Sequence, residues 1–286
     1  MKLDGRLLPV ALAVAGLAGG WLLRDATLRP VSTPREPALP SATPPTARAS
    51  EVASAAPPPS ASAPTDSSLI LGAFDTIYKG GVWGETGGVG SSGFGSSLRA
   101  TLLYRAFLQQ FLKDAAIRSV VDAGCGDWEF SQAIDWSGVD YKGYDIVPAV
   151  IARNQQRYGK PRVRFFVGDI LRDELPAADL LIVKNVLQHL TNADVAEFLK
   201  RLPRYKHALL INGVSERTLS AKNDDIAVGK YRELDPTRPP FKARGAKLLT
   251  YWDGGNMQQV VYVPGPGASP FVAASASARP AAPSPE

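Results

Sequence analysis

The stretch Val120–Trp128 (VVDAGCGDW) decides the fold of this chain. Apolar residues lead up to Asp122, as in a buried strand, and Gly124 and Gly126 follow at alternate positions. Because glycine has no Cβ, the backbone here can adopt positive φ and approach a ligand closely. The pattern is typical of a strand-to-helix turn, and we expect a helix over residues 129–136 whose first amides face the ligand.

Residue Glu129 distinguishes this turn from the one that binds dinucleotides. A dinucleotide-binding turn would place a third glycine at that position, whereas this chain carries a carboxylate there. A carboxylate repels a pyrophosphate but not a ligand that carries positive charge. The turn therefore argues against NAD.

Strands and helices alternate along the rest of the region, which is the pattern of a parallel α/β sheet. The turn residues at 253–256 separate two final apolar segments and predict a hairpin. Strands are predicted at 118–123, 141–144, 163–167, 180–183, 207–211, 247–252 and 257–263, and helices at 97–113, 129–136, 148–158 and 192–202.

Four charged residues fall at or just past the ends of predicted strands. Asp122, Asp145, Asp169 and Lys184 are separated by 23, 24 and 15 residues, about one strand–helix unit each. The carboxyl ends of parallel strands share one edge of the sheet, where ligands bind. Three carboxylates gathered there would repel one another unless hydrogen-bond donors faced them.

The motifs around these residues, taken in order, resemble those of class I S-adenosylmethionine-dependent methyltransferases. The resemblance covers about residues 118–263 and departs from the common pattern at Asp127-Trp128, where many members have a third glycine. It implies an α/β, Rossmann-like fold with a seven-stranded, mostly parallel sheet, a terminal antiparallel hairpin and helices on both faces. It also implies S-adenosylmethionine as cofactor.

The same resemblance assigns roles to individual residues. Asp145 would accept hydrogen bonds from both ribose hydroxyls, and Asp169 would contact the adenine amine or else only cap its own turn. An aromatic face suits a sulfonium, which makes Trp83 a further candidate. The full predicted cofactor set is Asp122, Gly124, Gly126, Asp145, Ile146, Asp169, Ile170, Lys184 and Trp83, and no metal site is predicted.

Methyl transfer from a sulfonium depends mainly on positioning, and a hydroxyl acceptor also needs a base. His189 follows the fourth strand and is the candidate base, although it could instead line the cofactor pocket.

Gln188, Tyr231 and Arg232 are candidate acceptor contacts, and Lys184 could also bind the acceptor or pair with a neighbouring aspartate. His207 opens a buried strand and is predicted to be structural. The glycine-rich segment 74–97 and the insertion 223–241 are predicted either to wall the pocket or to be surface loops.

The termini differ in composition from the predicted domain, residues 67–264. Residues 30–66 contain 10 Pro, 9 Ala, 6 Ser and 4 Thr, which predicts a disordered linker, and residues 265–286 are similar. Residues 1–29 contain the uncharged stretch Leu7–Leu23, just long enough for a membrane anchor. We expect the domain to face the cytoplasm, where the cofactor is made. A cleaved signal, giving a secreted or periplasmic protein, and a buried helix are the alternatives.

The sequence favours a small-molecule methyl acceptor. Basic residues gather at 153–164, but Tyr158 is the only aromatic residue suited to base stacking among them, which argues against nucleic acid as a partner. Lys184-Asn185-Val186-Leu187 stands where an amino-methylating enzyme of nucleic acid would carry an Asn-Pro-Pro-Tyr-like motif. A non-catalytic S-adenosylmethionine-binding module and an RNA or protein methyltransferase are the alternatives. The sequence does not specify an oligomeric state.

Overall fold

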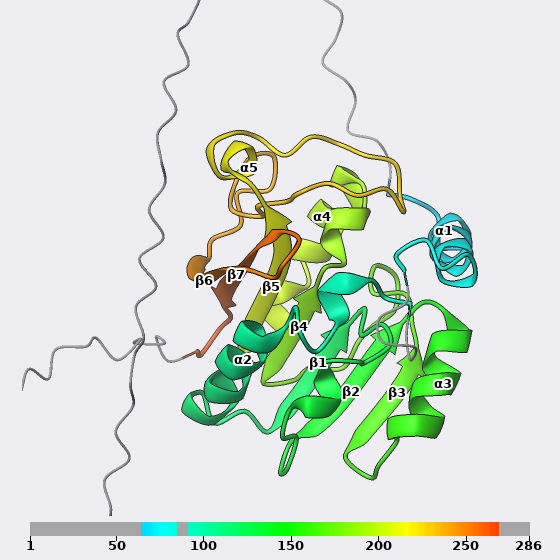
Figure 1. Ribbon diagram of the computed structural model, residues 1–286. Coiled ribbons are helices and arrows are strands. Elements are labelled where there is room, and N and C mark those ends of the chain that lie inside the picture. Colours follow the sequence, from blue (N-terminus) through cyan, green and yellow to red (C-terminus); the bar gives the residue numbers. More distant parts are fainter. Residues whose placement is uncertain (1–63, 85–90, 269–286) are drawn as a thin grey trace, which may run out of the picture. The chain divides into compact units, whose positions relative to one another are not determined.

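The computed structural model describes residues 64–84 and 91–268, which lie within one compact unit. Their centre is a seven-stranded sheet in the order β3-β2-β1-β4-β5-β7-β6 (Figure 1). Every strand pairing is parallel except those of β7, which runs antiparallel to β5 and to β6. The predicted fold class is therefore confirmed. The strands are β1 (Ser119–Ala123), β2 (Asp140–Asp145), β3 (Val163–Val167), β4 (Leu180–Lys184), β5 (His207–Val214), β6 (Ala246–Trp252) and β7 (Met257–Pro264).

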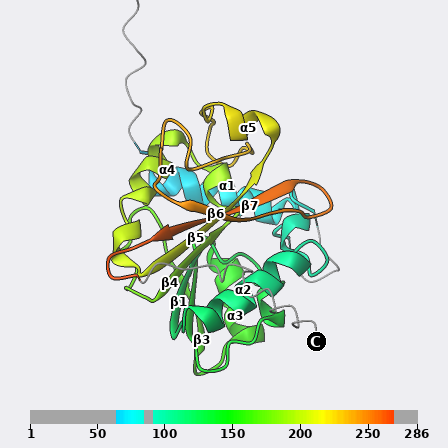
Figure 2. The ribbon, with the colours of Figure 1, turned by 90° about the vertical axis from the view of Figure 1, so that its left-hand side faces the viewer.

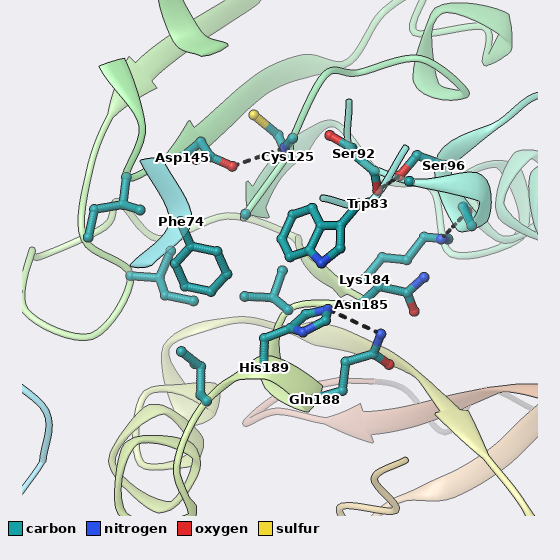
Figure 3. A pocket seen from close by; sticks show the side chains of 18 of the residues that line it. Phe74, Trp83, Ser92, Ser96, Cys125, Asp145, Lys184, Asn185, Gln188 and His189 are labelled. Carbon is teal, nitrogen blue, oxygen red and sulfur yellow. Dashed lines mark hydrogen bonds between the residues drawn. The ribbon is translucent and has the colours of Figure 1, made fainter. Parts of the chain in front are cut away.

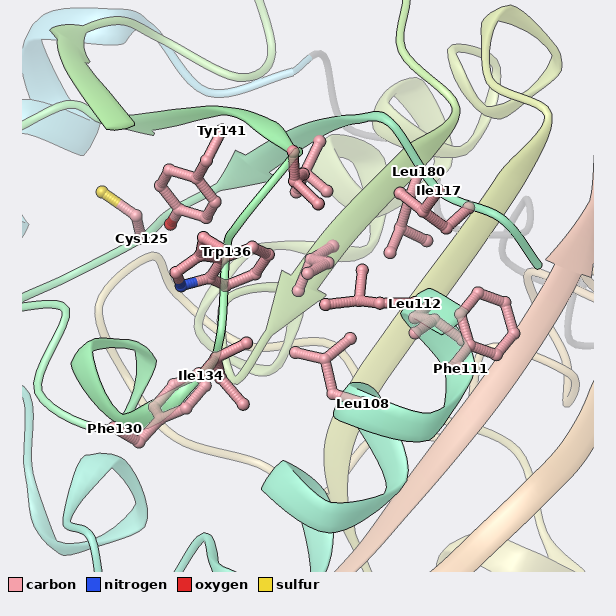
Figure 4. Close-up of a cluster of buried hydrophobic side chains, with 14 of the residues drawn as sticks. Leu108, Phe111, Leu112, Ile117, Cys125, Phe130, Ile134, Trp136, Tyr141 and Leu180 are labelled. Carbon is pink, nitrogen blue, oxygen red and sulfur yellow. The ribbon is translucent and has the colours of Figure 1, made fainter. Parts of the chain in front are cut away.

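Helices cover both faces of the sheet because alternate strand residues point to opposite sides. Helix α2 (Leu102–Asp114) packs on the face to which Val120 points, and Figure 4 shows this core around Leu108 and Trp136. Helices α1 (Ser67–Lys79) and α4 (Asn192–Leu199) pack on the face of Val121 (Figure 2). The remaining helices are α3 (Pro148–Tyr158), which packs along β2 and β3, and the short α5 (Glu216–Ser220) after β5.

The helix predicted over residues 129–136 is wrong. Only one 3-10 turn, Ser131–Ala133, forms there. Trp128, Phe130, Ile134 and Trp136 are all buried in the α2-side core, and their spacing does not fit one face of an α-helix. The indole nitrogen of Trp136 donates to the Ser131 carbonyl and stabilises this compact path. The Gly-x-Gly turn therefore does not lead into a helix N-terminus, contrary to the prediction.

Helix α1 was not among the predicted elements. Its second half lies in the segment 74–97, which was predicted to be a pocket wall or a surface loop. Its side chains Ile70, Phe74 and Ile77 are buried at helical spacing. The carboxylate of Asp66 caps the helix by accepting from the Ser68 amide at 2.8 Å. These two signals could have been found in the sequence.

The other predicted elements form with shifted ends. Helix α2 begins at Leu102 rather than at residue 97, because residues 97–101 form turns after the 3-10 turn Phe94–Ser96. Helix α4 ends at Leu199 rather than 202, and β5 continues to Val214 rather than 211.

The predicted anchor or signal (residues 1–29) lies outside the described residues, as do nearly all of the predicted linker and most of the tail. At the N-terminal boundary, the Thr65 amide and hydroxyl each donate to Asp194 at 2.7 Å, so the domain's interactions begin before residue 67. Within residues 64–84 and 91–268, no helix combines the length and apolar character that crossing a membrane requires.

Candidate functional site

A pocket of about 300 Å³ lies at the carboxyl edge of the parallel strands (Figure 3). It brings together residues from β1, β2, β4, the loop after β3 and the β6–β7 hairpin. Of the predicted site residues, those that line it are Trp83, Asp122, Gly124, Gly126, Asp145, Ile146, Asp169, Ile170, Lys184, Gln188, His189 and Tyr231, and Arg232 does not.

The Gly-x-Gly turn forms a tight cradle at the floor of this pocket. Gly124 has φ of 81°, and a Cβ at that position would overlap a methyl group of Val186. Gly126 has φ of 53°, and its Cβ would meet the Ser92 hydroxyl at 2.7 Å. Only glycine fits both the backbone conformation and the space. The two glycines therefore let Val186 and Ser92 pack directly on this turn, which lines the pocket.

Asp145 ends β2 beside this cradle, and the backbone fixes its carboxylate. One oxygen accepts from the Val147 amide at 3.0 Å and the other from the Gly126 amide at 3.2 Å. Burial raises the pKa of Asp145 to about 6. Each oxygen keeps acceptor capacity toward the pocket, so the carboxylate fits a ligand with neighbouring hydroxyl groups, such as a ribose.

Asp169 performs the turn-capping role that was its alternative prediction. One carboxylate oxygen accepts from the Leu171 amide at 2.8 Å, and the other accepts from the Ser67 hydroxyl at 2.5 Å. The residue also lines the pocket, together with Ile146 and Ile170. Its contact with an adenine amine stays a prediction, and the two isoleucines offer an apolar wall for a base.

Asp122 and Lys184 lie on the α2 side of the sheet edge. Asp122 accepts from the Tyr141 hydroxyl at 2.6 Å, and burial raises its pKa to about 7. The ammonium of Lys184 donates to the Gly95 carbonyl at 2.8 Å and lies 5.3 Å from the centre of the Phe130 ring. Burial lowers the pKa of Lys184 to about 8.

His189 lies beside an aromatic cluster, with its ring centre 4.9 Å from that of Trp83 (Figure 3). Its Nδ1 is 2.9 Å from the Lys230 carbonyl oxygen, which requires a proton on Nδ1, and its Nε2 accepts from the Gln188 amide nitrogen at 3.5 Å. Burial lowers the pKa of His189 to about 4. The imidazole is therefore neutral at physiological pH and only a weak base. Trp83 also packs against Tyr78 and Phe74, which belong to α1.

The predicted acceptor contacts separate into two groups. The Gln188 side-chain oxygen accepts from the Gly213 amide at 2.8 Å. The Tyr231 hydroxyl packs against the same glycine, since a Cβ there would lie 2.6 Å from it. Arg232 is instead bound within its own insertion, where it donates to the Asp224 carbonyl at 2.9 Å. Because the backbone of the insertion holds its guanidinium, the predicted acceptor contact of Arg232 is not supported. His207 lies away from the pocket, 2.9 Å from the Tyr262 hydroxyl.

Sequence reasoning missed how residues 91–97, which we call the strap, are fastened over the pocket. The Asp127 side chain, only 2% exposed, accepts from the Ser92 amide at 2.7 Å and the Ser92 hydroxyl at 2.9 Å, and also from the Ser91 amide. Arg153 pairs with its other oxygen. The departure from the family pattern at Asp127 was the available signal. The strap residues Ser92, Gly93, Phe94, Gly95 and Ser96 all line the pocket.

The lining residues that were missed include four polar ones close to Lys184 and on the β6–β7 hairpin. Asn185 follows Lys184, and Asp253, Asn256 and Gln258 belong to the β6–β7 hairpin. The sequence predicted the hairpin from its turn residues but gave no indication that its side chains face the pocket.

Comparisons with known proteins agree with this geometry. Residues 95–217 match the sequence model of a family described as the O-methyltransferase domain. No curated protein matches the chain. Among solved structures, the 1,6-didemethyltoxoflavin-N1-methyltransferase of Burkholderia thailandensis is 19% identical with a TM-score of 0.51, and the match covers 71% of this chain and 93% of that one. The magnesium protoporphyrin IX methyltransferase of Synechocystis PCC 6803 is 14% identical with a TM-score of 0.47, over 69% and 96% of the chains.

The family match starts in the strap and contains the Gly-x-Gly cradle, Asp145 and the segment after β4, whereas Trp83, Tyr231 and the lining residues of the β6–β7 hairpin lie outside it. The cradle and the oriented Asp145 carboxylate suit a nucleoside cofactor with a ribose. The chain therefore resembles the class I S-adenosylmethionine-dependent methyltransferases, and S-adenosylmethionine is the cofactor that this resemblance supports.

Proposed function

We propose that the protein methylates a hydroxyl group of a small-molecule acceptor. The observation that carries this proposal is the continuity of the pocket, which runs from the cradle and Asp145 past Lys184 to the β6–β7 hairpin. Its volume of about 300 Å³ is at the lower end of the range for small-ligand sites. The match to the O-methyltransferase domain family supports oxygen as the acceptor atom.

The residues of the chain supply orientation and a place for one proton. Bound S-adenosylmethionine supplies a methyl group that its sulfonium activates for displacement. The acceptor oxygen forms the new bond to the methyl carbon while the carbon–sulfur bond breaks, and that electron pair stays on the sulfur. Holding the two groups in line can contribute up to about 7–11 kcal/mol. The acceptor proton then passes to a basic side chain in the pocket.

We infer that Lys184 takes this proton in preference to His189. A base works best when its pKa is near the operating pH. Burial brings the pKa of Lys184 down to about 8, whereas it lowers the pKa of His189 to about 4. His189 is in addition packed against Trp83 and bound to the Lys230 carbonyl, which supports a role in forming the pocket wall.

The acceptor class is testable with radiolabelled S-adenosylmethionine and an extract separated into small-molecule, RNA and protein fractions. We expect the label to be transferred to the small-molecule fraction, because the pocket has the volume of a small-ligand site. The heat-inactivated protein is the control. Label found only in RNA or in protein would contradict the proposal.

Asp145→Asn tests the placement of the ribose. The variant should bind S-adenosylhomocysteine about ten- to a hundredfold more weakly in calorimetry, because a charged hydrogen bond contributes about 1.5–3 kcal/mol. In the wild type, affinity should fall as the pH drops through about 6, since protonation of the carboxylate removes the acceptor. The variant should lack this step. The surface substitution Asp75→Asn is the control, and unchanged affinity in Asp145→Asn would show that the ribose lies elsewhere.

Lys184→Met and His189→Gln separate the two candidate bases in the labelled-acceptor assay. We expect Lys184→Met to lower turnover by about a hundredfold or more and His189→Gln by less than tenfold. The wild-type rate should rise with pH through about 8, as Lys184 loses its proton. Affinity for S-adenosylhomocysteine, measured in parallel, shows whether each variant keeps its pocket. The reverse order of effects would make His189 the base.

We propose, from the sequence alone, that residues 7–23 hold the enzyme at a membrane with its domain in the cytoplasm. The full chain should then sediment with membranes and resist a salt wash. Leu12→Arg combined with Val14→Arg should release it, because each arginine at the centre of a span costs about 2.5–3.5 kcal/mol. Leu39→Arg, in the Pro-rich segment, is the matched control. A shortened, soluble mature protein outside the cytoplasm would instead indicate a cleaved signal.

A further inference from the structure

The pocket has a second end, at which Lys184 is the only one of the predicted cofactor contacts. Asp145 ends β2, whereas Gln258 lies on β7, and four strand spacings separate the two in the sheet. At about 4.8 Å per spacing, the two side chains lie on the order of 19 Å apart along the sheet edge. Lys184 on β4 stands between them. We call the far end the hairpin chamber, and its residues are Lys184, Asn185, Asp253, Asn256 and Gln258.

Gln258 is the most specific feature of the hairpin chamber. It is 3% exposed, and its amide nitrogen donates to an Asp253 carboxylate oxygen at 2.9 Å. The other Asp253 oxygen accepts from the amides of Gly255 and Asn256 at 2.8 and 2.7 Å. This network fixes the orientation of the Gln258 amide, because the reverse orientation would place its oxygen against the carboxylate.

The carbonyl oxygen of Gln258 is left without a donor. Among the described residues it is buried and has no hydrogen-bond partner, and the same holds for the side-chain oxygen of Asn185. An unsatisfied buried acceptor costs about 1–3 kcal/mol, so a pocket that holds one is suited to a ligand that donates to it. In the neutral form that acts as the base, Lys184 uses one of its two N–H donors on the Gly95 carbonyl and keeps its lone pair for the acceptor hydroxyl.

We propose that the hairpin chamber is the acceptor subsite and that it selects a small polar acceptor carrying an N–H or O–H donor, which binds the carbonyl oxygen of Gln258. The inference rests on the proposed function and adds the recognition chemistry. Lys184 holds an oxygen of the same acceptor, and the Asn185 side-chain oxygen accepts from a second donor where the acceptor has one.

The test uses matched aromatic probes on the full chain saturated with S-adenosylhomocysteine. Phenol, aniline and indole each carry a donor, and fluorobenzene, toluene and benzofuran are their counterparts without one. In ligand-observed NMR titrations, we expect each donor probe to bind about five- to tenfold more tightly than its counterpart, which corresponds to one net hydrogen bond. Gln258→Met, which keeps the size but removes the acceptor oxygen, should abolish this difference.

Gln259→Met is the control, because Gln259 is the next residue of β7, points to the opposite face and does not line the pocket. It should keep the preference for donor probes. The inference is overturned if the wild type shows no preference, if no probe binds, or if the preference survives in Gln258→Met. Calorimetry with S-adenosylhomocysteine distinguishes failure of this inference from failure of the proposed function. A wild type that does not bind S-adenosylhomocysteine contradicts the proposed function itself. Should Gln258→Met fail to fold, the wild-type probe pairs still decide.

Discussion

The close approach of the Gly124 backbone to Val186 is the constraint on which the site depends. No Cβ fits between the turn after β1 and the segment after β4, because it would overlap the Val186 side chain. The two segments are therefore held at the distance of a backbone–methyl contact. This contact sets the cofactor cradle directly beside Lys184, Gln188 and His189, so the cofactor and the acceptor end share one pocket.

The acidic edge of the sheet is stabilised mainly by donors that the chain itself provides. Asp122 receives the Tyr141 hydroxyl, Asp145 receives two backbone amides, and Asp169 receives an amide and the Ser67 hydroxyl. The repulsion expected from the sequence is thus largely resolved before any ligand binds. What remains is the cost of burial, which raises the pKa of Asp122 and of Asp145. A positively charged ligand stabilises the ionised carboxylates. The relief of this unfavourable burial contributes to the affinity of the ligand.

Local patterns in the sequence predicted the parts of the fold that local chemistry determines. The apolar strands, the Gly-x-Gly turn and the hairpin turn formed as predicted, since each depends on neighbouring residues. The helix after β1 did not form, because Trp128 and Trp136 are drawn into a core that distant strands complete. The same limit applies to Gln258 and to the strap, whose positions follow from the pairing of β7 with β5 and from the Asp127 contacts. Spacing along the chain contains no signal for these contacts.

Asp127 has a consequence for how this enzyme can change over evolution. The strap that walls the pocket is bound to the same loop that cradles the cofactor, so an altered strap also disturbs the cradle. The strap in turn touches the β6–β7 hairpin, because a Cβ on Gly254 would lie 3.1 Å from the Phe94 ring. The Asp253 carboxylate and a backbone hydrogen bond hold the hairpin turn itself. A change of the hairpin that alters acceptor selectivity at this contact can therefore reach the cofactor cradle through the strap and Asp127.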